Sequence, residues 1–221
     1  MTVSAVVRLS ISMSRICVVT ADGRAYYELV SRVRRAGLPF FSLSPGDACD
    51  GCDLVLTTRA EANQFKTATM VLEDFDTNDD VVRGSIISRL SGGETMLLVG
   101  LDPGSRIGMA AFLGETRLAS RTFNSKSGAC NDVVHLIEGV SVSRTTVRIG
   151  DGDPTLASWL ADNLASRLPG TVVEIVDESG TSQKSVDGLQ KDQGSAARIA
   201  FRKGEQFRPG DWKRRSRRRQ N

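Results

Sequence analysis

The chain has 221 residues, enough for one large domain or two small ones, and its 40% hydrophobic content suffices for a globular core. The net charge is +3, but residues 202–221 hold nine Lys and Arg against two acids, so this tail carries +7 and the rest of the chain −4. No apolar run reaches the roughly 18 residues of a membrane span, and residues 1–14 lack the long apolar stretch of a signal peptide. Composition therefore excludes a membrane-spanning protein, and we expect a cytoplasmic one.

After the leader of residues 1–14, the chain begins with a strand-like segment, RICVVTAD. The following AYYELVSRVRRAG has apolar residues on one helical face and Gly37 as a stop signal, so it predicts a helix. Three short strand-like runs come next, LPFFSLS, DLVLTT and MVLED. These elements predict a small α/β domain over residues 15–90, and nothing in the segment indicates its role.

The four cysteines include one closely spaced pair, Cys49 and Cys52, with the spacing of metal ligands or of a redox motif. A structural zinc ion needs four ligands. No second cysteine pair follows, and the single histidine, His135, lies far along the chain. A loop between two strands is therefore favoured over zinc or redox chemistry.

Ser91-Gly92-Gly93 is a plausible linker, and a second pattern follows it. MLLVGLD, RIGMAAFLG and TRLASRTFNS are strand-like and closely connected, so they predict an antiparallel meander. The helix NDVVHLIEGV, the strand TTVRIGDGD, the helix DPTLASWLADNLASRL, the strand TVVEIVDES and the helix KDQGSAARIAFRKG complete the order β-β-β-α-β-α-β-α. Asp153 and Pro154 fit the cap and the first position of the second helix.

Three segments carry a resemblance to a known family. The segment "VGLDPGSRIGMAAF" resembles the opening motif of RuvC-type Holliday-junction resolvases and their YqgF relatives. "VEIVDESGTS" is similar to the Asp-Glu-Arg-Leu-Thr-Thr segment of YqgF-like proteins, with Ser179 in place of Arg and Gly180 in place of Leu, and "KDQGSAARIAF" resembles the final helix of that family. The resemblance covers residues 95–203, about half of the chain. It implies a ribonuclease H-like domain with a mixed five-stranded sheet, preceded here by the small α/β domain.

The resemblance also implies a site and a function. It places catalytic, metal-binding carboxylates at Asp102, Glu178 and Asp192, with Asp151, rather than Asp153, as a fourth at the end of the fourth strand. Mg²⁺ or Mn²⁺ would be the cofactor. The implied protein is a homodimeric endonuclease that cleaves structured nucleic acid, with DNA junctions preferred and RNA next, in recombination and repair.

The chemistry supports this assignment, although each acid has a plainer interpretation. Phosphodiester hydrolysis needs charge stabilisation that divalent ions supply, and carboxylates gathered without a cation would repel one another. Asp102-Pro103-Gly104 also fits a turn, Asp151 fits a turn in a Gly-Asp-Gly loop, Glu178 fits a solvated loop and Asp192 fits a helix cap. The placement of an acid after each strand of the parallel half favours the metal site.

Several further residues are candidate nucleic-acid contacts, with ordinary surface polarity as the alternative. Near the acids these are Ser105, Arg106 and Lys184, and in the basic tail of residues 204–221 they are Arg214, Arg215, Arg217, Arg218 and Arg219. Three other functions stay open. They are a non-catalytic nucleic-acid-binding protein, an ATPase of the actin-like or sugar-kinase type, and an interaction protein whose acids only cap and turn. Residues 15–90 do not repeat the meander, which opposes the ATPase.

Overall fold

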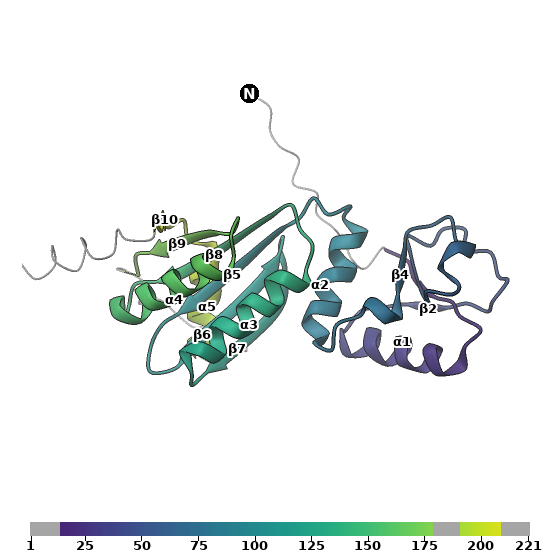
Figure 1. Cartoon of the computed structure of the whole chain (residues 1–221), viewed down its shortest axis with the longest axis horizontal. Coiled ribbons are helices and arrows are strands. Elements are labelled where there is room, and N and C mark those ends of the chain that lie inside the picture. Colours follow the sequence, from purple (N-terminus) through teal and green to yellow (C-terminus); the bar gives the residue numbers. More distant parts are fainter. Residues whose placement is uncertain (1–13, 179–190, 209–221) are drawn as a thin grey trace, which may run out of the picture. The chain divides into compact units, whose positions relative to one another are not determined.

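The structure, a computed structural model, describes residues 14–178 and 191–208, without the side chains of 191–193. It divides into two compact units (Figure 1). The N-terminal unit contains the described residues up to Glu94 together with Gly139–Ser141, and the C-terminal unit contains Thr95–Glu138 and the described residues from Val142 onward. Each unit has its own sheet flanked by helices, so the expected α/β class is confirmed. No helix among the described residues is long and apolar enough to cross a membrane.

The N-terminal unit is built on a four-stranded parallel sheet with the order β2-β1-β3-β4. Its elements in chain order are β1 (Ile16–Val18), α1 (Gly23–Arg35), β2 (Phe41–Ser42), β3 (Leu54–Thr57), the 3₁₀ helices η2 (Ala62–Gln64) and η3 (Leu72–Asp74) on either side of β4 (Thr69–Val71), and α2 (Asp79–Leu90). The central strands β1 and β3 are fully buried. Because β1 has β2 on one side and β3 on the other, the chain reverses its direction of winding between β1 and β3.

Local signals explain where α1 begins and ends. Asp22 is its N-cap and accepts hydrogen bonds from the backbone N–H groups of Arg24 and Ala25. Gly37, at φ 67°, follows the helix in the left-handed conformation that glycine adopts without strain. Helix α2 was not expected from the sequence, because its buried residues occur as adjacent pairs rather than at a clear helical spacing; they include Val81, Val82, Ile86 and Ile87.

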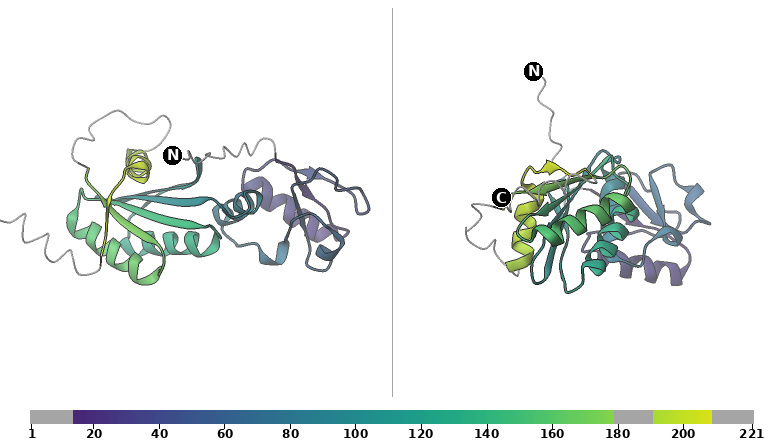
Figure 2. Two further views of the ribbon diagram at one scale, coloured as in Figure 1. Left: turned by 90° about the horizontal axis from the view of Figure 1, so that it is seen from above. Right: turned by 60° about the vertical axis from the view of Figure 1, so that its left-hand side comes forward.

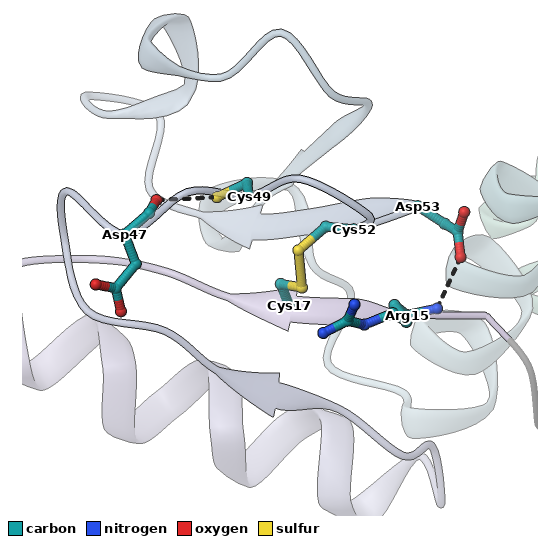
Figure 3. Close-up of a disulfide and its surroundings, with 6 residues drawn as sticks. All are labelled: Arg15, Cys17, Asp47, Cys49, Cys52 and Asp53. Atoms are coloured by element: carbon teal, nitrogen blue, oxygen red, sulfur yellow. Dashed lines mark hydrogen bonds between the residues drawn. A yellow bond between two sulfur atoms is a disulfide. The ribbon is translucent and has the colours of Figure 1, made fainter.

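A disulfide joins Cys17 in β1 to Cys52 in the turn that precedes β3, with the Cα atoms 6.1 Å apart (Figure 3). The turn closes where Cys52 N–H donates to the carbonyl of Cys49 at 3.0 Å. Cys49 itself is a free thiol packed against the same apolar cluster. The sequence spacing pointed to Cys49 and Cys52 as partners, whereas the adjacency of β1 and β3 makes Cys17 the partner of Cys52.

The C-terminal unit is built on a six-stranded mixed sheet with the order β10-β9-β8-β5-β6-β7. Its elements are β5 (Met96–Asp102), β6 (Ile107–Leu113), β7 (Thr116–Phe123), α3 (Lys126–Gly139), β8 (Arg144–Gly150), α4 (Pro154–Arg167), β9 (Val172–Val176), α5 (Lys191–Phe201) and β10 (Glu205–Gln206). Strands β5, β6 and β7 form an antiparallel meander, β8 and β9 run parallel to β5, and β10 is antiparallel to β9. The sixth strand, β10, lies in residues expected to belong to the basic tail.

Helices cover both faces of this sheet, with α3 and α4 on one face and α5 on the other (Figure 2). Helix α5 lies directly against β5, because a Cβ at Gly100 would be only 2.7 Å from the backbone nitrogen of Ala200. Ala196 and Ala200 pack here against Leu98 and Ala110 in a buried cluster. Small residues at the contact therefore set the close approach of α5 to the strand that carries Asp102.

Candidate functional site

Three of the predicted acids lie at the carboxyl ends of three adjacent parallel strands. Asp102 is the last residue of β5, Asp151 directly follows β8, and Glu178 comes two residues after β9. The strands are in register at this edge, since Leu101 pairs with Ile149. Ligands of open α/β sheets bind outside the carboxyl ends of the strands, so these acids occupy the edge at which a site is expected.

The segments after β8 and β9 are joined by hydrogen bonds in both directions. The backbone N–H of Glu178 donates to Asp151 Oδ1 at 3.0 Å, and the backbone N–H of Gly152 donates to Glu178 Oε1 at 3.2 Å. The backbone N–H of Asp151 donates to the carbonyl of Val176 at 3.0 Å. Asp151 and Glu178 are therefore held as one unit, although they lie 27 positions apart in the sequence.

Two glycines leave the room that the Glu178 carboxylate occupies. A Cβ at Gly150 would overlap Glu178 Oε1 and would lie 2.8 Å from Ile199 Cδ1 of α5. A Cβ at Gly152 would lie 3.2 Å from the same oxygen. The Gly150-Asp151-Gly152 loop, which the sequence also allowed as simple turn chemistry, is thus the floor beneath a carboxylate.

The pKa of Glu178 is raised above its ordinary value, first because the group is partly buried and then because the charges of Asp102 and Asp151 act on it. The hydrogen bond from Gly152 and the charge of Arg202 oppose this shift in pKa. Arg202 also donates to the carbonyl of Asp177 at 2.8 Å, which ties the end of α5 to this segment. Carboxylates from three strands therefore act on one another, and a cation beside them would favour their ionised forms.

Asp153 has a different role from its neighbours. It is the N-cap of α4 and accepts a hydrogen bond from the backbone N–H of Leu156 at 3.0 Å, with Pro154 in the first turn. The predicted cap is confirmed. Ser105 and Arg106, the two candidate phosphate contacts, are exposed in the bend between β5 and β6, three and four residues beyond Asp102.

The remaining predicted site residues are described only in part or not at all. Asp192 lies in the first turn of α5, a helix that contacts β5 and β8, but its side chain falls outside the described residues. Lys184 and five arginines of the tail also lie outside them, namely Arg214, Arg215, Arg217, Arg218 and Arg219. The structure therefore brings together Asp102, Asp151 and Glu178 only.

These carboxylates fit a divalent metal by chemistry but do not by themselves form a compact ligand set. Among the side chains that the structure describes, no group of three or more His, Cys, Asp or Glu is arranged to hold an ion. Mg²⁺ takes hard oxygen ligands and keeps several waters, so few protein ligands suffice. The raised pKa of Glu178 reflects the mutual repulsion that a cation would relieve.

Sequence reasoning missed the role of Arg202, which it counted as part of the basic tail, and of Gly150 and Gly152. The Gly-Asp-Gly pattern after a buried strand was a usable signal, since paired glycines there permit a close approach of another group. Arg202 had no comparable signal, because only the packing of α5 brings it to the segment after β9.

The comparisons with known proteins concern the other unit. Residues 15–87, about a third of the chain, match the family model of the response regulator receiver-like domain. The matched segment runs from β1 into α2 and lies within the N-terminal unit. No curated protein matches the chain significantly.

This match corrects the family assigned from the sequence. The detected similarity is to receiver-like domains, so the assignment to the RuvC and YqgF nucleases is wrong, together with the associated terms Holliday junction, DNA recombination and DNA repair. The assignment rested on short segments built of turn-forming and helix-capping residues, which occur in many folds. The segment after β9 also departed from the family pattern at Ser179 and Gly180.

Proposed function

We propose that the C-terminal unit has a ribonuclease H-like fold and is a metal-dependent endonuclease that hydrolyses phosphodiester bonds in structured nucleic acid. The connectivity supports the fold, because a three-stranded antiparallel meander is followed by two strands that add in parallel beside its first strand. The acids at the carboxyl ends of β5, β8 and β9 support the chemistry.

One observation carries the proposal. The raised pKa of Glu178 has, after partial burial, the charges of Asp102 and Asp151 as its causes, so three neighbouring strand ends bring carboxylates within electrostatic reach of one another. An acidic group with a strongly perturbed environment at a strand edge is typical of a functional site. Turn and cap chemistry, the plainer interpretation, accounts for Asp153 but gives no reason for this convergence.

The residues have distinct parts in the proposed site. Asp102, Asp151 and Glu178, joined by Asp192 from α5, would hold Mg²⁺ or Mn²⁺. When bound, the ion supplies a water of lowered pKa and stabilises charge on the attacking and leaving oxygens. The hydrogen bond from Gly152 orients the carboxylate of Glu178. Ser105 and Arg106, exposed beyond Asp102, would contact a substrate phosphate.

The substrate class follows from charge. Arginines of the basic tail and Lys184 would neutralise backbone phosphates without reading bases, which suits recognition of a shape rather than a sequence. We propose structured DNA first and structured RNA second, with the protein as a homodimer.

The test is cleavage of branched, duplex, single-stranded and RNA substrates by the full chain, with and without Mn²⁺. We expect Mn²⁺-dependent cleavage by the wild-type chain, and Asp102→Asn should reduce it by about 100-fold or more while nucleic-acid binding persists. Asp162→Asn, a matched change at an exposed position of α4, should leave cleavage unchanged. Cleavage by Asp102→Asn at the wild-type rate would reject the proposed site.

A non-catalytic nucleic-acid-binding protein is the principal alternative. The melting temperature of the wild-type chain distinguishes the two, because a metal that binds the folded state alone raises that temperature. Binding of nucleic acid with neither cleavage nor a Mn²⁺-dependent rise in melting temperature would favour the alternative.

A further inference from the structure

The N-terminal unit contains a polar cluster at the carboxyl ends of its two central strands. Six polar or charged residues are buried among those the structure describes, and three of them, Thr20, Thr57 and Thr58, surround the carboxylate of Glu61. Thr20 follows β1, whereas Thr57 and Thr58 end and follow β3. Buried polar groups are costly unless their hydrogen bonds are made, so this gathering around one carboxylate needs an explanation.

The donors converge on both oxygens of Glu61. Its Oε2 accepts from the hydroxyl groups of Thr20 at 2.5 Å, Thr58 at 2.7 Å and Thr57 at 3.3 Å. Its Oε1 accepts from the backbone N–H of Ala21 at 2.7 Å. The hydroxyl of Thr20 also accepts from the backbone N–H of Asp22, which aligns it to donate to the carboxylate.

All four donors to Glu61 are neutral, and together they favour an anion. Partial burial opposes ionisation of Glu61, yet the hydrogen bonds from Thr20, Ala21 and the threonines of β3 outweigh it and lower the pKa. The nearby guanidinium of Arg59 pairs with Asp74 instead. The cluster therefore stabilises negative charge through oriented dipoles, as backbone and hydroxyl anion sites do.

The location of the cluster independently points to a ligand. The order β2-β1-β3-β4 places the reversal of winding between β1 and β3. In open parallel sheets, ligands bind at this reversal, outside the carboxyl ends of the strands. Glu61 fills that position from the segment between β3 and η2, where it is the N-cap residue of η2 but makes no side-chain capping bond.

We propose that the carboxyl ends of β1 and β3 form a binding site for a small oxyanion, a carboxylate or phosphate group, and that Glu61 occupies it as a built-in ligand. The donors recognise two oxygens of one anionic group, which both chemistries supply. An external oxyanion competes with Glu61 and, on binding, frees the segment that carries it. The site thus couples the presence of the anion to the position of residues 59–64.

The test uses full-length Glu61→Ala, which vacates the site, and Glu61→Gln, which keeps it filled by a neutral group of the same shape. Melting temperatures are measured at pH 7 and constant ionic strength, with chloride replaced by acetate or by phosphate. At ten times its dissociation constant, the anion should raise the melting temperature of Glu61→Ala by about 3 to 5 °C. The wild-type chain and Glu61→Gln should show no matching rise.

The two anions distinguish a planar carboxylate from a tetrahedral phosphate as the preferred ligand. Thr58→Val combined with Glu61→Ala removes one donor and should abolish the response. If Glu61→Ala does not fold in chloride, recovery of folding in acetate or phosphate supports the site. Equal responses of Glu61→Ala and Glu61→Gln to both anions, or no recovery of folding in either, would overturn the proposal.

Discussion

Arg148 of β8 and Glu174 of β9 are directly opposite each other, and Arg148 Nε donates to Glu174 Oε2 at 2.7 Å. Each side chain is only 17% exposed. Arg148 also donates to the carbonyl of Ala200, and the backbone N–H of Gly204 donates to Glu174. This one ion pair therefore connects the sheet to the end of α5 and to the segment that leads into β10.

Removal of one partner of this pair should destabilise the C-terminal unit. Glu174→Leu leaves the guanidinium of Arg148 largely buried without its partner, and we expect a loss of about 2 kcal/mol in the free energy of unfolding by urea, less than for a fully buried pair. Arg148→Met combined with Glu174→Leu should recover part of the loss. Equal losses in the single and double variants would show that the pair has no such role.

The pH dependence of stability should reveal the strained carboxylate of Glu178. Its pKa in the folded protein lies above the ordinary value of 4.5, so the folded state binds this proton more tightly than the unfolded state does. Stability is therefore lost as pH rises from 4.5 through the raised pKa. Glu178→Gln should gain stability at pH 7 and lose that advantage at pH 4, as measured by urea unfolding. The same change at exposed Glu115 should have no such pH dependence.

Gly150→Ala should displace the Glu178 carboxylate, because the new methyl group would overlap Glu178 Oε1. We expect a loss of about 1 to 3 kcal/mol in stability, as for other insertions into packed sites, and loss of any Mn²⁺-dependent rise in melting temperature. Gly194→Ala is the matched control, since a Cβ there has no heavy atom within 4 Å. A full Mn²⁺ response in Gly150→Ala would separate Glu178 from the metal site.

Reduction of the disulfide between Cys17 and Cys52 should destabilise the N-terminal unit. The bond closes a loop with a sequence separation of 35, for which chain entropy predicts about 4 kcal/mol. Hydrogen exchange of β1 and β3 peptides should accelerate in a dithiol and equally in Cys52→Ser. Cys49→Ser should leave exchange unchanged, because that thiol is free. Exchange that is insensitive to reduction would contradict this role of the bond.

Truncation after Arg208 tests the basic tail while retaining β10. The removed residues 209–221 contain six Lys or Arg. If they bind the nucleic-acid backbone, affinity for a duplex should fall, and the slope of log affinity against log salt should flatten by about 0.9 for each phosphate that the tail had neutralised. Fluorescence anisotropy over a salt series gives both values. An unchanged slope would assign the tail another role.

The sequence by itself determined features that depend on neighbouring residues. The end of α1 before Gly37 and the cap of α4 at Asp153 follow from local backbone preferences and hydrogen bonds. The positions of Asp102 and Asp151 at strand ends were also predictable, because an apolar run marks a buried strand and its last residues mark the sheet edge. These features can be recognised within a few residues of the chain.

Only the tertiary structure decided which distant residues meet. It paired Cys52 with Cys17 rather than Cys49, placed Glu178 above Gly150, and brought Arg202 to the segment after β9. The spacing of Thr58 and Glu61 resembles a local capping box, yet Glu61 reaches across to β1. The reason is physical: such contacts depend on strand order and on helix packing, and these arise when the whole chain buries its apolar surface.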